Sequence, residues 1–180
     1  MGNIYKSTLG ELQLEEHYDL ALVIHSLYEF PRENDETILS LDKLGQLVSV
    51  YGSGVIITEH SEGDFQKMKR ELYPAFGKKD PLSSDIIART LEKFRIPFRV
   101  GDKIESQFNL DSFIDKSSIE IGKNMAFLFS DSLDDEPLHE AIYVQIGEWV
   151  KENIRQCNGH SYLWTPDITL WTFNKCADYS

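Results

Sequence analysis

YGSGVIITEHSEGDF, at residues 51–65, joins two glycines to an apolar run and then to a cluster of acids. The run at 54–58 has the β-branched residues typical of a strand. Gly52 and Gly54 precede that run, and glycines in this position are typical of a hairpin turn. Residues 37–50 begin with alternating apolar and polar residues and end with β-branched residues. We therefore predict a strand there that pairs with 54–58 across the glycines.

The second half of the stretch has two interpretations. Glu59 and His60 end the predicted strand, and a carboxylate beside a histidine is a common pair for general base catalysis or metal ligation. Ser61 and Asp64 have the spacing of a capping box, which would make the same segment an ordinary helix start. Both interpretations stay open from the sequence.

The glycines themselves do not indicate a phosphate site. A phosphate-binding loop follows a strand and opens a helix, whereas Gly52 and Gly54 precede their strand. Ser53 also lacks the context of a nucleophile elbow. The sequence therefore predicts no nucleotide-binding loop in this stretch.

Outward from this stretch, the sequence predicts helices and strands in no regular alternation. We expect a helix at 80–94, with Asp80 as its cap and Pro81 in its first position, and another from Pro137 to about Ile154. Residues 98–101 and 118–131 have strand character, and residues 9–30 fit either a helix or a strand. A turn at 165–168 predicts a C-terminal hairpin that carries Trp164 and Trp171.

These elements predict an α+β fold: a single globular domain over residues 1–180, with a mixed, mostly antiparallel sheet and two to four helices. The length of 180 residues suits one domain. Hydrophobic residues make up 41% of the chain, which is enough to form a core without disulfide or metal support.

Acidic charge is the dominant feature of the composition. The net charge is −12, and the two ends of the chain carry most of the excess acid. Such a field repels nucleic acid phosphates and anionic membrane surfaces, and it speeds encounter with basic proteins. We therefore expect no direct nucleic acid binding and no membrane association.

Cysteine usage and the absence of an apolar spanning run predict a cytoplasmic protein. The two cysteines, Cys157 and Cys176, fit a reducing compartment, although their pairing stays open. Together with His160 they lack the regular four-ligand spacing of a structural zinc site. We predict no cofactor and no resident metal.

The leading functional hypothesis is a small acidic inhibitor of the immunity or antitoxin type, which neutralises a basic enzyme such as a nuclease toxin by protein–protein interaction. The expected partner-binding residues are acids in two clusters and two tryptophans: Glu33, Asp35, Glu36, Asp134, Asp135, Glu136, Trp164 and Trp171.

Two alternatives remain beside the inhibitor. One is a small metal-dependent hydrolase that uses Glu59, His60 and Asp131 as catalytic residues. The other is a structural or DNA-mimicking protein of the phage type.

Overall fold

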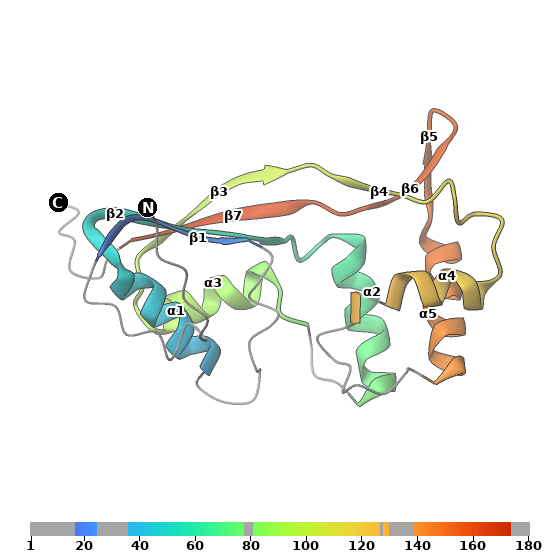
Figure 1. Ribbon diagram of the computed structural model, residues 1–180, viewed down its shortest axis with the longest axis horizontal. Helices are drawn as coiled ribbons and strands as arrows, with labels where there is room; N and C mark the ends of the chain where they lie inside the picture. The colour runs from blue at the N-terminus through green and yellow to red at the C-terminus, as the bar shows by residue number, and fades with distance from the viewer. Residues whose placement is uncertain (1–16, 25–35, 78–80, 127, 130–138, 174–180) are drawn as a thin grey trace, which may run out of the picture. The chain divides into compact units, whose positions relative to one another are not determined.

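The computed structural model describes residues 17–24, 36–77, 81–126, 128–129 and 139–173. The chain divides into two compact units, each with helices and strands, so its α+β class is confirmed (Figure 1). Unit 1 comprises Met1–Thr58, Asp85–Asp102 and Ile168–Ser180, and unit 2 comprises Glu59–Ser84 and Lys103–Asp167. One globular domain over residues 1–180 stays a prediction.

Unit 1 is built on a four-stranded sheet in the order β1-β2-β7-β3. Strands β1 and β2 are parallel, with Leu22 opposite Val55, and helix α1 connects them. Helices α1 and α3 lie along the same side of the sheet (Figure 1). The elements are β1 Tyr18–Ile24, α1 Glu36–Leu47, β2 Val48–Glu59, α3 Ser84–Lys93, β3 Phe98–Ile104 and β7 Asp167–Phe173.

Helix α1 replaces most of the strand that the sequence predicted at 37–50. Leu41, Leu44 and Leu47 recur every three residues, and all three are buried. That spacing places them on one helical face. The segment therefore forms a helix, although apolar and polar residues also alternate in parts of it. Ile87 and Leu91 of α3 supply the corresponding buried positions of the second helix.

The predicted hairpin across Gly52 and Gly54 is wrong, because β2 runs unbroken from Val48 to Glu59. A Cβ at Gly52 would lie 2.7 Å from the backbone oxygen of Tyr18 in β1, and one at Gly54 would collide with the Thr172 hydroxyl of β7. Glycine is therefore required here for close contact with the neighbouring strands, not for a turn.

Unit 2 combines four helical segments with a three-stranded sheet in the order β4-β6-β5. Its elements are α2 Asp64–Leu72, the 3-10 helix η2 Tyr73–Phe76, β4 Gln107–Asn109, α4 Ser118–Met125, α5 Glu140–Asn153, β5 Arg155–Cys157 and β6 His160–Trp164. A buried apolar cluster holds them together: Met68, Tyr73, Leu110, Ile121, Met125, Leu128, Phe129, Ile146, Trp149, Val150 and Leu163.

Helix α4 lies where the sequence predicted a central strand at 118–131. Ser117 starts it with a capping box, in which its hydroxyl accepts from the Glu120 backbone N–H and the Glu120 carboxylate accepts from the Ser117 N–H. Ile121 and Met125, four residues apart, are buried on one face. The apolar run therefore belongs to a buried helix, a case that periodicity alone does not separate from a buried strand.

Two glycines set the distance between α4 and α5. A Cβ at Gly122 would collide with the backbone carbonyl of Tyr143, and a Cβ at Gly147 would collide with that of Ser118. Both glycines are buried. The two helix backbones therefore touch directly, which no other residue permits at either position.

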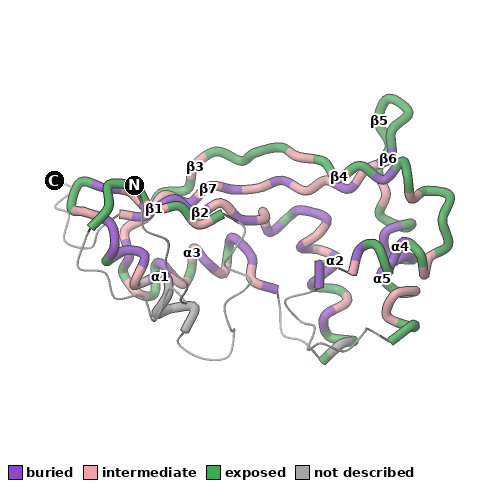
Figure 2. The backbone as a smooth tube through the Cα atoms, in the orientation of Figure 1, coloured by how far each residue is buried: buried purple, intermediate pink, exposed green. Residues whose placement is uncertain are grey.

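A hairpin that the sequence analysis did not predict is formed by β5 and β6, which pair antiparallel around Asn158 and Gly159. These two residues have φ values of 52° and 80°, as a two-residue hairpin turn requires. Strand β5 is exposed along its length, whereas β7 alternates between buried and half-buried residues (Figure 2). Strands β6 and β7 form at 161–173, but they belong to different sheets, so the hairpin predicted around the turn at 165–168 is wrong.

Helix α5 confirms the predicted second helix, whereas α3 begins at Ser84 instead of Asp80. Pro81 therefore precedes the helix, and Asp80 lies outside the described residues. The undecided segment at 9–30 contains strand β1. Across the part of the chain that the structure describes, no helix has the length and hydropathy needed to span a bilayer.

Substituting Gly147 by Ala should lower the free energy of unfolding by about 3 kcal/mol, because the new methyl group forces α4 and α5 apart. Gly45→Ala is a matched control, since this helical glycine of α1 has only the Ile96 side chain nearby, at 3.8 Å. The control should be neutral or stabilising by up to about 1 kcal/mol. Urea unfolding followed by circular dichroism measures both, and equal effects would contradict the close-packing argument.

Candidate functional site

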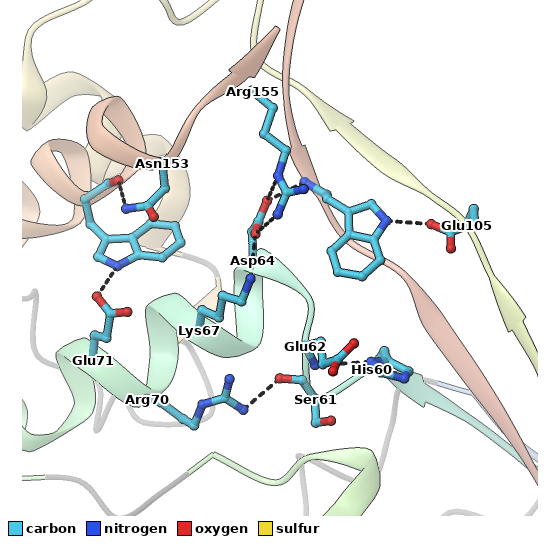
Figure 3. A network of polar contacts seen from close by, with 12 residues as sticks. His60, Ser61, Glu62, Asp64, Lys67, Arg70, Glu71, Glu105, Asn153 and Arg155 are labelled. Carbon is cyan, nitrogen blue, oxygen red and sulfur yellow. Dashed lines mark hydrogen bonds and ion pairs between the residues drawn. The ribbon is translucent and has the colours of Figure 1, made fainter. Parts of the chain in front are cut away.

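The most extensive polar cluster in Figure 3 surrounds the carboxylate of Asp64, the first residue of α2. Asp64 is only 3% exposed. Its carboxylate accepts two bonds from Arg155, at 3.0 Å from Nε and 2.8 Å from Nη2, and a third from the backbone N–H of Trp164 at 2.7 Å. Lys67 lies 3.7 Å away on the next turn. These cations balance the charge of a carboxylate that burial would otherwise disfavour.

The half-buried ring of Trp164 lies beside two cations. The Arg155 guanidinium carbon is 5.3 Å from the ring centroid, and the Lys103 ammonium nitrogen is 4.7 Å from it. The indole N–H donates to Glu105. We call Asp64, Lys67, Lys103, Glu105, Arg155 and Trp164 the Asp64 network.

Glu105 completes the network at its exposed edge. Lys103 lies 2.8 Å from its carboxylate. The hydrogen bonds from Lys103 and then from Trp164 lower the pKa of Glu105 below its ordinary value. Every charged group of the network thus has an opposite charge or an N–H donor nearby. The arrangement is suited to holding an aromatic ring in one orientation for recognition, because two cations lie beside the Trp164 ring and Glu105 accepts from its N–H.

Glu59 and His60 do not form the pair that the sequence suggested. The Glu59 carboxylate accepts from Gln66 Nε2 at 2.6 Å and lies 3.4 Å from the ammonium of buried Lys69. His60 Nδ1 instead accepts from the backbone N–H of Glu62 at 3.1 Å. Their polar atoms therefore bind separate partners, and Glu59 and Lys69 form an internal ion pair.

The capping box predicted at Ser61 is also wrong. The N-cap of α2 is Gly63, and no side chain caps the helix. The Ser61 N–H instead donates to the Ser84 hydroxyl, and its carbonyl accepts from Arg70. Ser61 thus binds both Arg70 of α2 and Ser84, the last residue of the first segment of unit 2.

The other predicted site residues are scattered or lie beyond the described ranges. Trp171 is half-buried in β7, with the Arg99 guanidinium 6.0 Å from its ring, and Glu36 is the first residue of α1. Among the described residues no cluster of three potential metal ligands occurs. Six predicted residues lie outside the described ranges: Glu33, Asp35, Asp131, Asp134, Asp135 and Glu136.

A second polar group, missed from the sequence, joins β6 to the turn after β4. Asp111 accepts from the Ser161 backbone N–H at 2.7 Å and lies 2.7 Å from His160 Nδ1. The bond from Ser161, followed by those from His160 and Asn109, lowers the pKa of Asp111 to about 2. Asn109 and Asp111 have the local spacing of a turn, but their contact with residues fifty positions later leaves no sequence signal.

Comparisons with known proteins identify the fold but no family. No family model matches the chain, and no curated protein matches it. A solved structure of a putative methyltransferase from Bacillus halodurans is similar over 93% of this chain and 69% of its own, with 10% identity and a TM-score of 0.54. The YcgJ protein from a Bacillus species gives the same identity and coverage, with a TM-score of 0.52. At this identity the likeness shows a shared fold.

These structural neighbours contradict the functional hypotheses drawn from the sequence. The immunity or antitoxin-type inhibitor, its basic protein partner, the metal-dependent hydrolase and the DNA mimic are each wrong, because the fold resembles that of a putative methyltransferase. The error has a physical cause: net charge reports solubility and long-range attraction, and it carries no information about fold.

Replacing Arg155 by Met should lower the free energy of unfolding by about 2 kcal/mol, because buried Asp64 loses its bidentate partner. The loss is smaller than for a fully buried pair, since the Arg155 side chain is 42% exposed. Lys67→Met, which removes an exposed cation 3.7 Å from the same carboxylate, should cost less than about 1 kcal/mol. Urea titration compares the two, and a larger loss for Lys67→Met would contradict this assignment.

Acid titration should reveal the Asp111 contact. The folded pKa of about 2 lies below the unfolded value, so Asp111 stabilises the fold above about pH 4 and this stabilisation disappears as the pH falls toward 2. Asp111→Asn should therefore melt at a lower temperature than the parent at pH 5, and the gap should close near pH 2. Asp115→Asn controls for the loss of one charge from the same turn. A gap that persists at pH 2 would refute the prediction.

Proposed function

We propose that the protein transfers a methyl group to a small molecule. The observation that carries this proposal is the fold: the structure of a putative methyltransferase matches 93% of the chain with a TM-score of 0.54. The parallel β1–α1–β2 unit supports it, since nucleotide-binding α/β folds are built from such units. A cytoplasmic location, predicted from the sequence, stays part of the proposal.

Trp164 is the residue that we assign to substrate contact. Its ring is half-buried, and its orientation is set by Arg155, Lys103 and Glu105. A ring held in this way offers a rigid apolar surface with little conformational entropy to lose on binding. The net charge of −12 favours a neutral or cationic substrate over a phosphorylated one.

The methyl donor of such enzymes is S-adenosylmethionine, and the described residues do not fit the glycine-rich cradle that doubly wound folds use for nucleotides. The space beside Gly52 and Gly54 is filled by Tyr18 and Thr172. The sequence of residues 25–35, which follows β1, contains no glycine and lies outside the described ranges. Glu59, the acid at the end of β2, is engaged by Gln66 and Lys69. We therefore derive no catalytic step through the donor.

The proposal is tested by isothermal titration of the full chain with S-adenosylhomocysteine, the stable demethylated product. We expect saturable binding in the roughly micromolar range. ATP is the matched control: it shares the adenosine but carries a triphosphate, which the acidic protein should repel. If S-adenosylhomocysteine does not bind, or binds no better than ATP, methyl transfer by this chain is refuted.

A further inference from the structure

A small apolar cavity lies within unit 2, between α4, α5 and the turn that follows β4. Its volume is about 70 Å³. Six apolar side chains and one cation line it: Leu110, Phe113, Ile114, Ile121, Val150, Ile154 and Lys151. The cavity shares no residue with the Asp64 network, and its lining lies entirely within the described residues.

Burial of the lining side chains distinguishes the floor of the cavity from its mouth. Leu110, Ile121 and Val150 are each 1% exposed and belong to the unit 2 core. Ile114 is 39% exposed and marks the open side. A ligand can therefore enter past Ile114 without unfolding the core.

The size and lining define the apolar part of a ligand. A 150 Å³ cavity lined by aliphatic and aromatic side chains stays dry and binds benzene. A cavity of about 70 Å³ therefore suits a short branched chain of three or four carbons. Its apolar walls offer a water molecule too few polar partners to stay bound.

Two cations define the polar part of the ligand. Lys151 lines the cavity, and the Lys116 ammonium lies 5.2 Å from the ring centroid of Phe113, another lining residue. Both lysines are exposed, in a chain whose net charge is −12. A lysine stem can contact apolar surface while its ammonium stays in water. An anionic group at the mouth thus finds a positive partner.

We propose that this cavity binds a small carboxylate with a short branched apolar tail, the tail among Ile121, Val150 and Ile154 and the carboxylate at Lys151. The site does not rest on methyl transfer and would exist beside it. Tail burial supplies the affinity, and Lys151 selects carboxylates over neutral analogues of the same shape.

Methyl NMR of the isoleucine-labelled full chain, titrated with 3-methylbutanoate, tests the site. Shifts should be saturable and confined to Ile114, Ile121 and Ile154, while Ile56 and Ile87 of unit 1 stay unchanged. 2-Methylpropanoate, one CH₂ shorter, should bind about fourfold more weakly. Absent or unsaturable shifts, or shifts spread over both units, would overturn the site.

Two variants test the contacts of the apolar tail and of the carboxylate one at a time. Ile114→Trp fills the mouth and should abolish the shifts of Ile121 and Ile154. Lys151→Gln should weaken 3-methylbutanoate binding roughly threefold and leave 3-methylbutan-1-ol unaffected. Lys123→Gln, an exposed lysine of α4 outside the lining, should change neither ligand.

Three results would refute the proposal even if Ile114→Trp failed to fold. Equal binding of the acid and the alcohol, with no effect of Lys151→Gln, would exclude a carboxylate ligand. Equal losses of carboxylate affinity in Lys151→Gln and Lys123→Gln would show that the effect comes from net charge and not from a contact at Lys151. Shifts of the same methyl groups on diluting the free protein would show that a second copy of the chain occupies the cavity.

Discussion

The carboxylate of Asp64 is the contact on which unit 2 depends. Unit 2 is assembled from two separate chain segments, Glu59–Ser84 and Lys103–Asp167. Asp64 belongs to the first segment, whereas its donors Arg155 and Trp164 belong to the second, 91 and 100 residues away. One buried side chain thereby joins the start of α2 to strands β5 and β6. Its three N–H donors offset the cost of removing a charge from water.

The sequence predicted those elements whose signals are local, and it failed where contacts with distant segments decided the outcome. Residues 54–58 and 98–101 form strands, and α5 forms near its predicted bounds, because β-branched runs and an amphipathic face are visible in short windows. Residues 118–131 did not give a strand, because a buried helix shows the same apolar run. Gly52 and Gly54 were assigned to a turn, whereas glycine is needed at these positions because a side chain would collide with Tyr18 or Thr172.

The candidate site could be predicted only in part, because its contacts join segments that are distant in the sequence. Trp164 was predicted as a contact residue, but Asp64 was assigned to a helix cap, and its pairing with Arg155 leaves no trace in the spacing of residues. The charge argument failed differently. Asp64, Glu59, Glu105 and Asp111 are acids whose carboxylates pair with groups of the protein itself. A count of acids therefore overstates how many are available to attract a partner.

The contact of α4 with α5 bears on how other chains with this helix pair can be recognised. At 10% identity, most side chains differ between this chain and the putative methyltransferase that shares its fold. Gly122 and Gly147 are different, because any added atom collides with the facing backbone. Any chain that keeps this helix contact needs glycine at both positions, or must separate the two helices. Two such glycines, the first shortly after a capping box like that of Ser117 and Glu120, are therefore a sequence pattern by which other chains with this helix pair can be recognised.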